Sequence, residues 1–150
     1  YIVRYRINEG AMKNFLPIYA NAAKLRAMGN AYIVESLERA GLTAVVPSHG
    51  DVMKLLFENG ASNMSELARR VGRTKSTMTV LVNKLEKEGY VRKISDPEDS
   101  RGVLVELTSK GQALEPIFED ISNGLEEKIA AKLNPKEMQV LDDLLKKCVE

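Results

Sequence analysis

The sequence has 150 residues, of which 44% are hydrophobic and 29% charged, and 22 Lys and Arg side chains balance 21 Asp and Glu. This composition is typical of one folded soluble domain and excludes a disordered, fibrous or disulfide-rich chain. With Cys148 and His49 as the only Cys and His, a Cys-rich zinc module is excluded, and a His-based metal or catalytic site would depend on one imidazole.

The composition also bears on location. No apolar run reaches the roughly 18 to 20 residues of a membrane span, and the first residues do not follow the pattern of a secretion signal. A single cysteine suits a reducing compartment. We therefore expect a cytoplasmic protein that does not use a membrane as a partner.

The charges are unevenly distributed along the chain. Residues 60 to 110 hold ten basic and seven acidic side chains, whereas residues 111 to 150 hold five basic and nine acidic ones. The stretch from Arg69 to Lys84 contains five basic residues and no acidic one. A basic segment beside an acidic end is typical of nucleic-acid binding, and a solvated helix face is the alternative.

Helical periodicity covers the first part of the chain. Apolar residues at helix-like spacing predict one long helix over about Asn14 to Ala40, which begins near Pro17 because proline is tolerated only in a first turn. Ser48 followed by Asp51 resembles an N-cap with a carboxylate at the third position, which predicts a helix over Ser48 to Asn59.

Two short helices are predicted next. The first is capped by Asn63 and ends at Gly72, and the second opens at Thr74 and ends at Gly89. A hairpin follows, with strands at 90–94 and 103–107 and a polar tip between them.

The C-terminal part is helical again. Its apolar stripe predicts one helix that starts at Thr108 and continues to Leu133, and a last helix with Pro135 at its first position. We expect Cys148 on the apolar face of that last helix, as a buried core thiol.

The spacing within the two short helices is informative. A helix-turn-helix needs a small residue where its helices cross, a glycine in the turn and apolar residues that pack back. Ala68, Gly72, Met78 and Leu81 occupy these positions in order. The pattern therefore favours a helix-turn-helix over an ordinary helical hairpin.

The other face of the second short helix is polar and free of carboxylates. Ser, Thr and Lys side chains bind phosphates, N-terminal residues of a recognition helix reach base edges, and Thr79 and Val80 have methyl groups of the kind that contact thymine. This face consists of Lys75, Ser76, Thr77, Thr79, Val80, Asn83 and Lys84.

The hairpin offers a second DNA contact. Arg101 beside Gly102 could place a guanidinium in a narrow minor groove of DNA. Arg92 and Lys93 lie at the base of the hairpin, where they would face the DNA backbone. Asp99 either supports the orientation of Arg101 or is, like Asp96, a good turn former.

These residues resemble the MarR family of bacterial and archaeal transcription regulators. The most specific parts are the runs from Leu85 to Lys93 (LEKEGYVRK) and from Asp96 to Thr108 (DPEDSRGVLVELT), followed by Gly111. The resemblance covers nearly the whole chain. It implies a mostly α fold with a small β-hairpin wing, in which a winged helix-turn-helix domain is joined to N- and C-terminal dimerisation helices.

The resemblance also implies a function. Such a protein binds a palindromic operator in double-stranded DNA as a homodimer, usually as a repressor that a small-molecule effector releases. We expect a single domain over 1–150, with the DNA-binding lobe at 47–108 and dimerisation helices at 1–46 and 109–150. Apolar stripes longer than one winged domain can cover support a dimer, and packing within one chain is the alternative.

Carried over position by position, the resemblance implies a DNA-binding surface and a wing support. Ser100 stands where many members have a second arginine, and Val80 where a polar or basic residue is frequent. Asp99 is the wing support, and the DNA-binding residues are Arg73, Thr74, Lys75, Ser76, Thr77, Thr79, Val80, Asn83, Lys84, Arg92, Lys93, Ser100 and Arg101.

An effector site is a further hypothesis. A pocket between the dimerisation helices and the DNA-binding lobe could accept an aromatic or amphipathic anion, and its candidate residues, which are equally plausible as core, are Phe15, Tyr19, Tyr32, His49 and Phe57. We expect no metal and no cofactor, with His49 a core or helix-terminal residue.

Two other functions fit the sequence less well. A winged-helix protein-interaction module would not need the carboxylate-free face or Arg101. A small enzyme built on Ser48, His49 or Asp51 would lack a second catalytic group at recognisable spacing and a glycine-rich phosphate loop. A DNA-binding regulator without enzymatic activity is therefore the leading prediction.

Overall fold

The computed structural model describes residues 17–97 and 102–149. Four predicted site residues, Phe15, Asp99, Ser100 and Arg101, lie outside the described residues. The elements are α1 (Ile18–Arg39), α2 (Pro47–Asn59), β1 (Ser62–Asn63), α3 (Met64–Val71), α4 (Lys75–Lys87), β2 (Val91–Ser95), β3 (Val103–Leu107), α5 (Ser109–Gln112), α6 (Glu115–Ala130) and α7 (Pro135–Val149). The mostly α class with a hairpin wing is confirmed.

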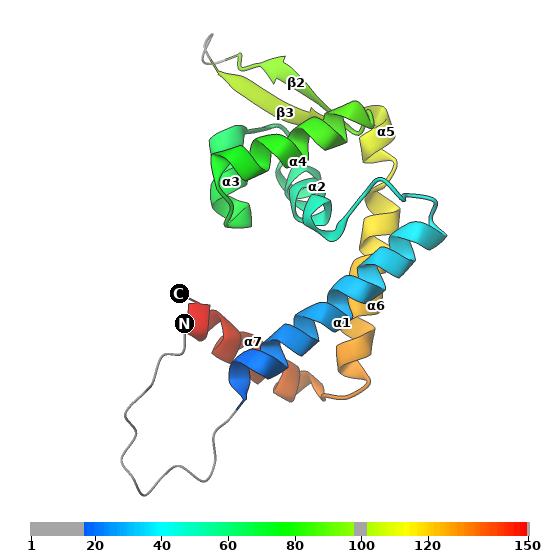
Figure 1. Cartoon of the computed structure of the whole chain (residues 1–150), viewed down its shortest axis with the longest axis vertical. Helices are drawn as coiled ribbons and strands as arrows, with labels where there is room; N and C mark the ends of the chain where they lie inside the picture. The colour runs from blue at the N-terminus through cyan, green and yellow to red at the C-terminus, as the bar shows by residue number, and fades with distance from the viewer. Residues whose placement is uncertain (1–16, 98–101, 150) are drawn as a thin grey trace, which may run out of the picture.

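The elements form two regions (Figure 1). Helices α2, α3 and α4 lie beneath the small sheet at one end, and α1, α6 and α7 occupy the other end. The sheet has the order β1-β3-β2, and all its strands are antiparallel. Strand β1, which pairs Ser62 with Val105, was not predicted because a two-residue strand leaves no periodic signal.

The core confirms the helix-turn-helix spacing. Ala68 and Met78 are buried where α3 and α4 pack, and Leu81 is buried beside them. Gly72 ends α3 with φ +66°, a left-handed conformation that glycine adopts without steric cost. The turn and the crossing therefore have the residue types that the sequence predicted.

Three of the predicted helix starts are confirmed. The Asn63 side chain accepts a hydrogen bond from the Glu66 backbone N–H, and the Thr74 side chain accepts one from that of Thr77. Pro135 opens α7, preceded by Asn134, whose side chain accepts from the Glu137 backbone N–H. Each of these caps satisfies a backbone donor that the helix itself cannot pair.

The predicted cap at Ser48 is wrong. Helix α2 begins one residue earlier, at Pro47, and Val46 is its N-cap residue. The backbone N–H of Val46 donates to Nδ1 of His49 at 3.2 Å, so the imidazole plays the part that a Glu or Gln takes in an ordinary capping box.

The predicted single helix from Thr108 to Leu133 is also wrong. Thr108 does cap a helix, since its side chain accepts from the Gly111 N–H, but α5 ends at Gln112 and α6 begins at Glu115. Pro116 is the reason, because its ring would clash with the carbonyl of residue 112 and it has no N–H to donate.

Helix α7 exposes several apolar side chains. Cys148 is exposed, which contradicts the prediction of a buried thiol. Val140, Leu144 and Leu145 on the same helix are exposed as well. Among the described helices, none is both long and apolar enough to cross a membrane.

Candidate nucleic-acid interface and cavity

Helix α4 is held rigidly against the rest of the lobe. Met78, Val82 and Leu85 are fully buried, and the N–H of Arg73 closes the α3–α4 turn by donating to the Ala68 carbonyl at 2.9 Å. The opposite face of the helix is therefore fixed in position while its side chains remain in solvent. A helix that enters a DNA groove needs this arrangement.

The predicted recognition residues all lie on exposed positions. Those on α4 and its cap are Thr74, Lys75, Ser76, Thr77, Thr79, Val80, Asn83 and Lys84. Part of their hydrogen-bonding capacity serves the helix itself, since Thr74 Oγ1 lies 2.9 Å from Ser76 Oγ and Thr79 Oγ1 donates to the Lys75 carbonyl. Arg73, Lys75 and Lys84 form no ion pair with any described residue, which leaves three cations for an external anion.

Other predicted cations are paired. Arg92 binds Glu106 across the β2–β3 ladder at 2.6 Å. The Nζ atom of Lys93 donates to Glu86 Oε2 at 2.6 Å and to Asn83 Oδ1 at 2.7 Å. Lys93 thus links the wing to the recognition helix.

The basic run at the end of α3 is partly neutralised. Arg69 and Arg70 both donate to the Glu66 carboxylate, at 2.8 and 2.6 Å for its Oε1 atom. These hydrogen bonds lower the pKa of Glu66 to about 2. The unpaired positive charge near the DNA-binding face therefore comes from the turn and α4 rather than from α3.

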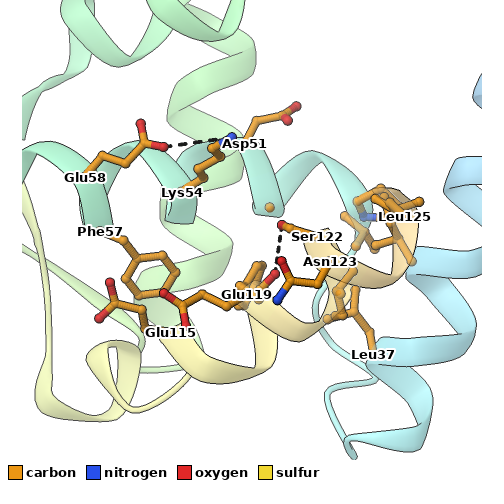
Figure 2. A pocket seen from close by; sticks show the side chains of 16 residues that line it. Leu37, Asp51, Lys54, Phe57, Glu58, Glu115, Glu119, Ser122, Asn123 and Leu125 are labelled. Atoms are coloured by element: carbon orange, nitrogen blue, oxygen red, sulfur yellow. Dashed lines mark hydrogen bonds and ion pairs between the residues drawn. The ribbon is translucent and has the colours of Figure 1, made fainter. Parts of the chain in front are cut away.

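A cavity of about 610 Å³ lies between α1, α2 and α6 (Figure 2). Phe57 and Phe118 form its aromatic wall, with ring centroids 5.8 Å apart. Four carboxylates and one ammonium group line it: Asp51, Glu58, Glu115 and Glu119 with Lys54. Lys54 lies 3.9 Å from Glu58, and burial raises the pKa of Asp51 in spite of the positive charges of Arg73, Lys54 and Arg26.

Of the predicted effector residues, Phe57 lines this cavity. Tyr19 is 89% exposed on α1, and Tyr32 packs against Gly124 with Lys128 4.6 Å from its ring centroid. The acidic lining was missed because its residues come from helices far apart in sequence, which no local pattern brings together. No group of three or more His, Cys, Asp or Glu in the described part of the chain is arranged to hold a metal ion.

His49 is a core residue, as expected. It is 1% exposed, and burial lowers its pKa, with a further contribution from the charge of Lys84. Its Nδ1 atom accepts from the Val46 N–H, whereas Nε2 has no hydrogen-bond partner among the described residues. Burial and the charge of Lys84 thus both favour the neutral form of the imidazole at the start of α2.

Comparison with known proteins agrees with this geometry. Residues 46–103 match the model of the MarR family. The HTH-type transcriptional regulator FarR of Neisseria gonorrhoeae is 32% identical over 97 residues, which are 63% of this chain and 64% of FarR. The chain thus spans somewhat less than two thirds of that relative.

Two solved structures have the same fold. A variant of MarR from E. coli complexed with operator DNA has a TM-score of 0.80 at 22% identity, covering 90% of this chain and 95% of its own. BpsR of Bordetella bronchiseptica, whose DNA binding is regulated by 6-hydroxynicotinic acid, has a TM-score of 0.77 at 19% identity, covering 90% of this chain and all of its own. The segment 46–103 is therefore similar to the MarR family, and the fold of the chain is the fold of these two structures.

Proposed function

We propose that the protein is a sequence-specific DNA-binding transcription regulator that acts as a homodimer on a palindromic operator. The outer face of α4 from Lys75 to Lys84, a stretch without a carboxylate, carries this proposal. That face is fixed by a buried inner face, and with the adjacent turn it offers three cations that form no ion pair with a described side chain. Phosphate contacts from such groups position a protein on DNA, and base contacts specify the sequence.

The DNA-binding surface comprises Arg73 and the α4 residues, with the hairpin as a second contact. Arg92 and Lys93 would support the wing, because both are paired within the chain. Arg101, Ser100 and the supporting Asp99 remain predictions from the sequence. A protein-interaction module is not favoured by any of these observations.

A second copy of the chain completes the assembly in this proposal. Helices α1 and α7 expose large apolar side chains, among them Met28, Val34, Val140 and Leu144. Covering this surface with a partner stabilises both copies, since burial of apolar area is favourable. The expected division is a lobe at 47–108 and dimerisation helices at 1–46 and 109–150, with two α4 helices about 34 Å apart.

The cavity between α1, α2 and α6 is the place for an effector. It joins a dimerisation helix to the lobe, so a ligand there would bias the spacing of the two recognition helices. Ligand control of DNA binding in BpsR supports this role. Because carboxylates predominate in the lining, we expect a neutral or cationic amphipathic ligand rather than the anion expected from the sequence.

The remaining functional assignments are part of the same proposal. We expect the protein to repress transcription until the effector binds. We also expect it to act in the cytoplasm and to have no catalytic activity. His49, the one imidazole, is buried as the N-terminal support of α2 and so is not available as a general base.

DNA binding as a function of salt tests the proposal. Affinity of the full chain for duplex DNA from upstream of its own gene should fall steeply with salt, because phosphate contacts release counterions. Lys75→Ala should lower affinity and reduce the slope of log affinity against log salt by about one. Lys132→Ala, which removes an equal charge from the α6–α7 connection, should change neither. Absent or salt-insensitive binding would contradict the proposal.

A further inference from the structure

Val80 is an exposed apolar side chain at the centre of a polar surface. It is 55% exposed, and Ser76, Asn83 and Lys87 lie four residues before, three after and seven after it, on the same face of α4. The buried residues Met78 and Leu85 lie on the opposite face. Val80 thus takes no part in the core.

An exposed valine in a helix does not stabilise the fold. Its branched side chain loses rotamer freedom, and Ala, Lys or Glu would be more favourable there. In the major groove, the apolar group that a base presents is the C5 methyl group of thymine. Contact with a thymine methyl group would therefore be more favourable for this valine side chain than exposure to water.

Asn83 is held in one orientation by Lys93. The Lys93 ammonium can only donate hydrogen bonds, so the atom 2.7 Å away must be the amide oxygen of Asn83. Glu86 holds the same ammonium at 2.6 Å, which fixes the pair. Because Lys93 occupies one of the two acceptor positions of Oδ1, the NH₂ is the group of Asn83 left wholly free, and no described residue accepts a hydrogen bond from it.

This orientation changes what Asn83 can read. A bidentate contact with adenine would require Oδ1 to accept from the adenine N6 amine while it also accepts from Lys93. A donor alone instead matches an acceptor such as O4 of thymine. Val80 and Asn83 are one helical turn apart, and thymine presents its methyl group beside O4.

We propose that Val80 and Asn83 together read thymine in the major groove, Val80 by contact with the C5 methyl group and Asn83 by donating to O4. Lys93 is a positioning residue that keeps the Asn83 donor outward. This inference rests on the proposed function, and it assigns the sequence preference of the same surface.

Deoxyuridine, which differs from thymidine in lacking the C5 methyl group, tests the role of Val80. In a duplex that the chain binds with a steep salt dependence, each thymine is replaced in turn by deoxyuridine. Replacement of the contacted thymine in one half-site should weaken binding about fourfold, the value for one buried methyl group. Val80→Ala should weaken binding to the thymine duplex and abolish the difference between the two bases. Val46→Ala, an exposed valine outside α4, should preserve the difference.

Asn83→Asp tests the donor. The carboxylate keeps the shape of the side chain but has no N–H. Its added charge weakens binding to every duplex, so the donor role is measured by sequence preference: the variant should lose the preference for thymine at the position sensitive to deoxyuridine, with the unfolding transition preserved. If Val80→Ala leaves the discrimination intact, or no deoxyuridine replacement matters, the inference is overturned while DNA binding stands. If the native chain binds no duplex, the proposed function and the inference fail together.

Discussion

Gly111 packs directly against the backbone of Tyr90: a Cβ atom at position 111 would overlap the Tyr90 carbonyl oxygen. The same carbonyl accepts a hydrogen bond from the Thr108 N–H at 3.0 Å, and the Thr108 hydroxyl donates to the Gly89 carbonyl at 2.6 Å. The start of the wing and the start of α5 are therefore joined backbone to backbone.

Gly111→Ala should destabilise the protein. Alanine is favoured over glycine in a helix, but here its methyl group meets a fixed carbonyl rather than a flexible side chain, so strain dominates. We expect the free energy of unfolding to fall by about 1–3 kcal/mol in urea titrations.

Gly50→Ala is the matched control for that substitution. Gly50 also lies in a helix, and an added Cβ would make an ordinary contact of 3.7 Å with the Phe118 ring. We expect a change between zero and a gain of about 1 kcal/mol, from helix propensity alone. Equal losses in both variants would refute the role assigned to the Gly111 contact.

The state of His49 predicts a pH dependence of stability. Burial lowers its pKa in the folded chain below the ordinary 6.5, so below that pH the unfolded chain binds a proton that the folded chain does not. The free energy of unfolding is therefore unaffected by this group above pH 6.5 and falls below it, by at most about 1.4 kcal/mol per pH unit.

Urea titrations between pH 8 and pH 5 measure this effect. In His49→Gln, the free energy of unfolding should fall less as the pH is lowered, because the amide oxygen of glutamine can still accept from the Val46 N–H but does not titrate. An unchanged decline in the variant would assign the pH dependence to other groups.

The parts of the fold that the sequence predicted are those set by local chemistry. Caps at Asn63 and Thr74 and the turn at Gly72 depend on residues three or four apart, and all three are confirmed. The break at Pro116 was equally local and was missed because the apolar stripe continued across it. Strand β1, the exposure of Cys148 and the acidic cavity depend on distant segments, so no local pattern contained them.

The exposed apolar face of α7 predicts that the chain dimerises through this face. A charged side chain introduced there should disrupt the dimer. Leu144 is 57% exposed, and Leu144→Glu should shift the chain toward monomer in sedimentation equilibrium, since a buried unpaired carboxylate is costly. Far-UV circular dichroism should stay unchanged.

Gln139→Glu adds the same charge to the polar face of α7 and should leave the dimer intact. A chain that is monomeric without substitution, or a dimer indifferent to Leu144→Glu, would exclude this face as the interface.

The acidic cavity predicts a preference among ligands. A lipophilic cationic dye should bind more tightly than a phenolic acid of similar size in fluorescence titrations, because four carboxylates and one ammonium line the site. Glu119→Gln should weaken the dye about two- to fivefold, the effect of one partly exposed charge pair. Phe57→Ala should weaken both probes, and tighter binding of the acid would contradict the assigned charge preference.

Selection of bound sequences from a randomised duplex library tests whether the chain is a dimeric, sequence-specific DNA-binding protein. We expect enrichment of an inverted repeat with half-sites about one helical turn apart, roughly 10 base pairs from centre to centre, bound by two chains. Enrichment should disappear with Lys75→Ala and Asn83→Asp combined and persist with Lys132→Ala. Recovery of no inverted repeat, or recovery of the same repeat with the variant that combines Lys75→Ala and Asn83→Asp, would contradict the proposed function.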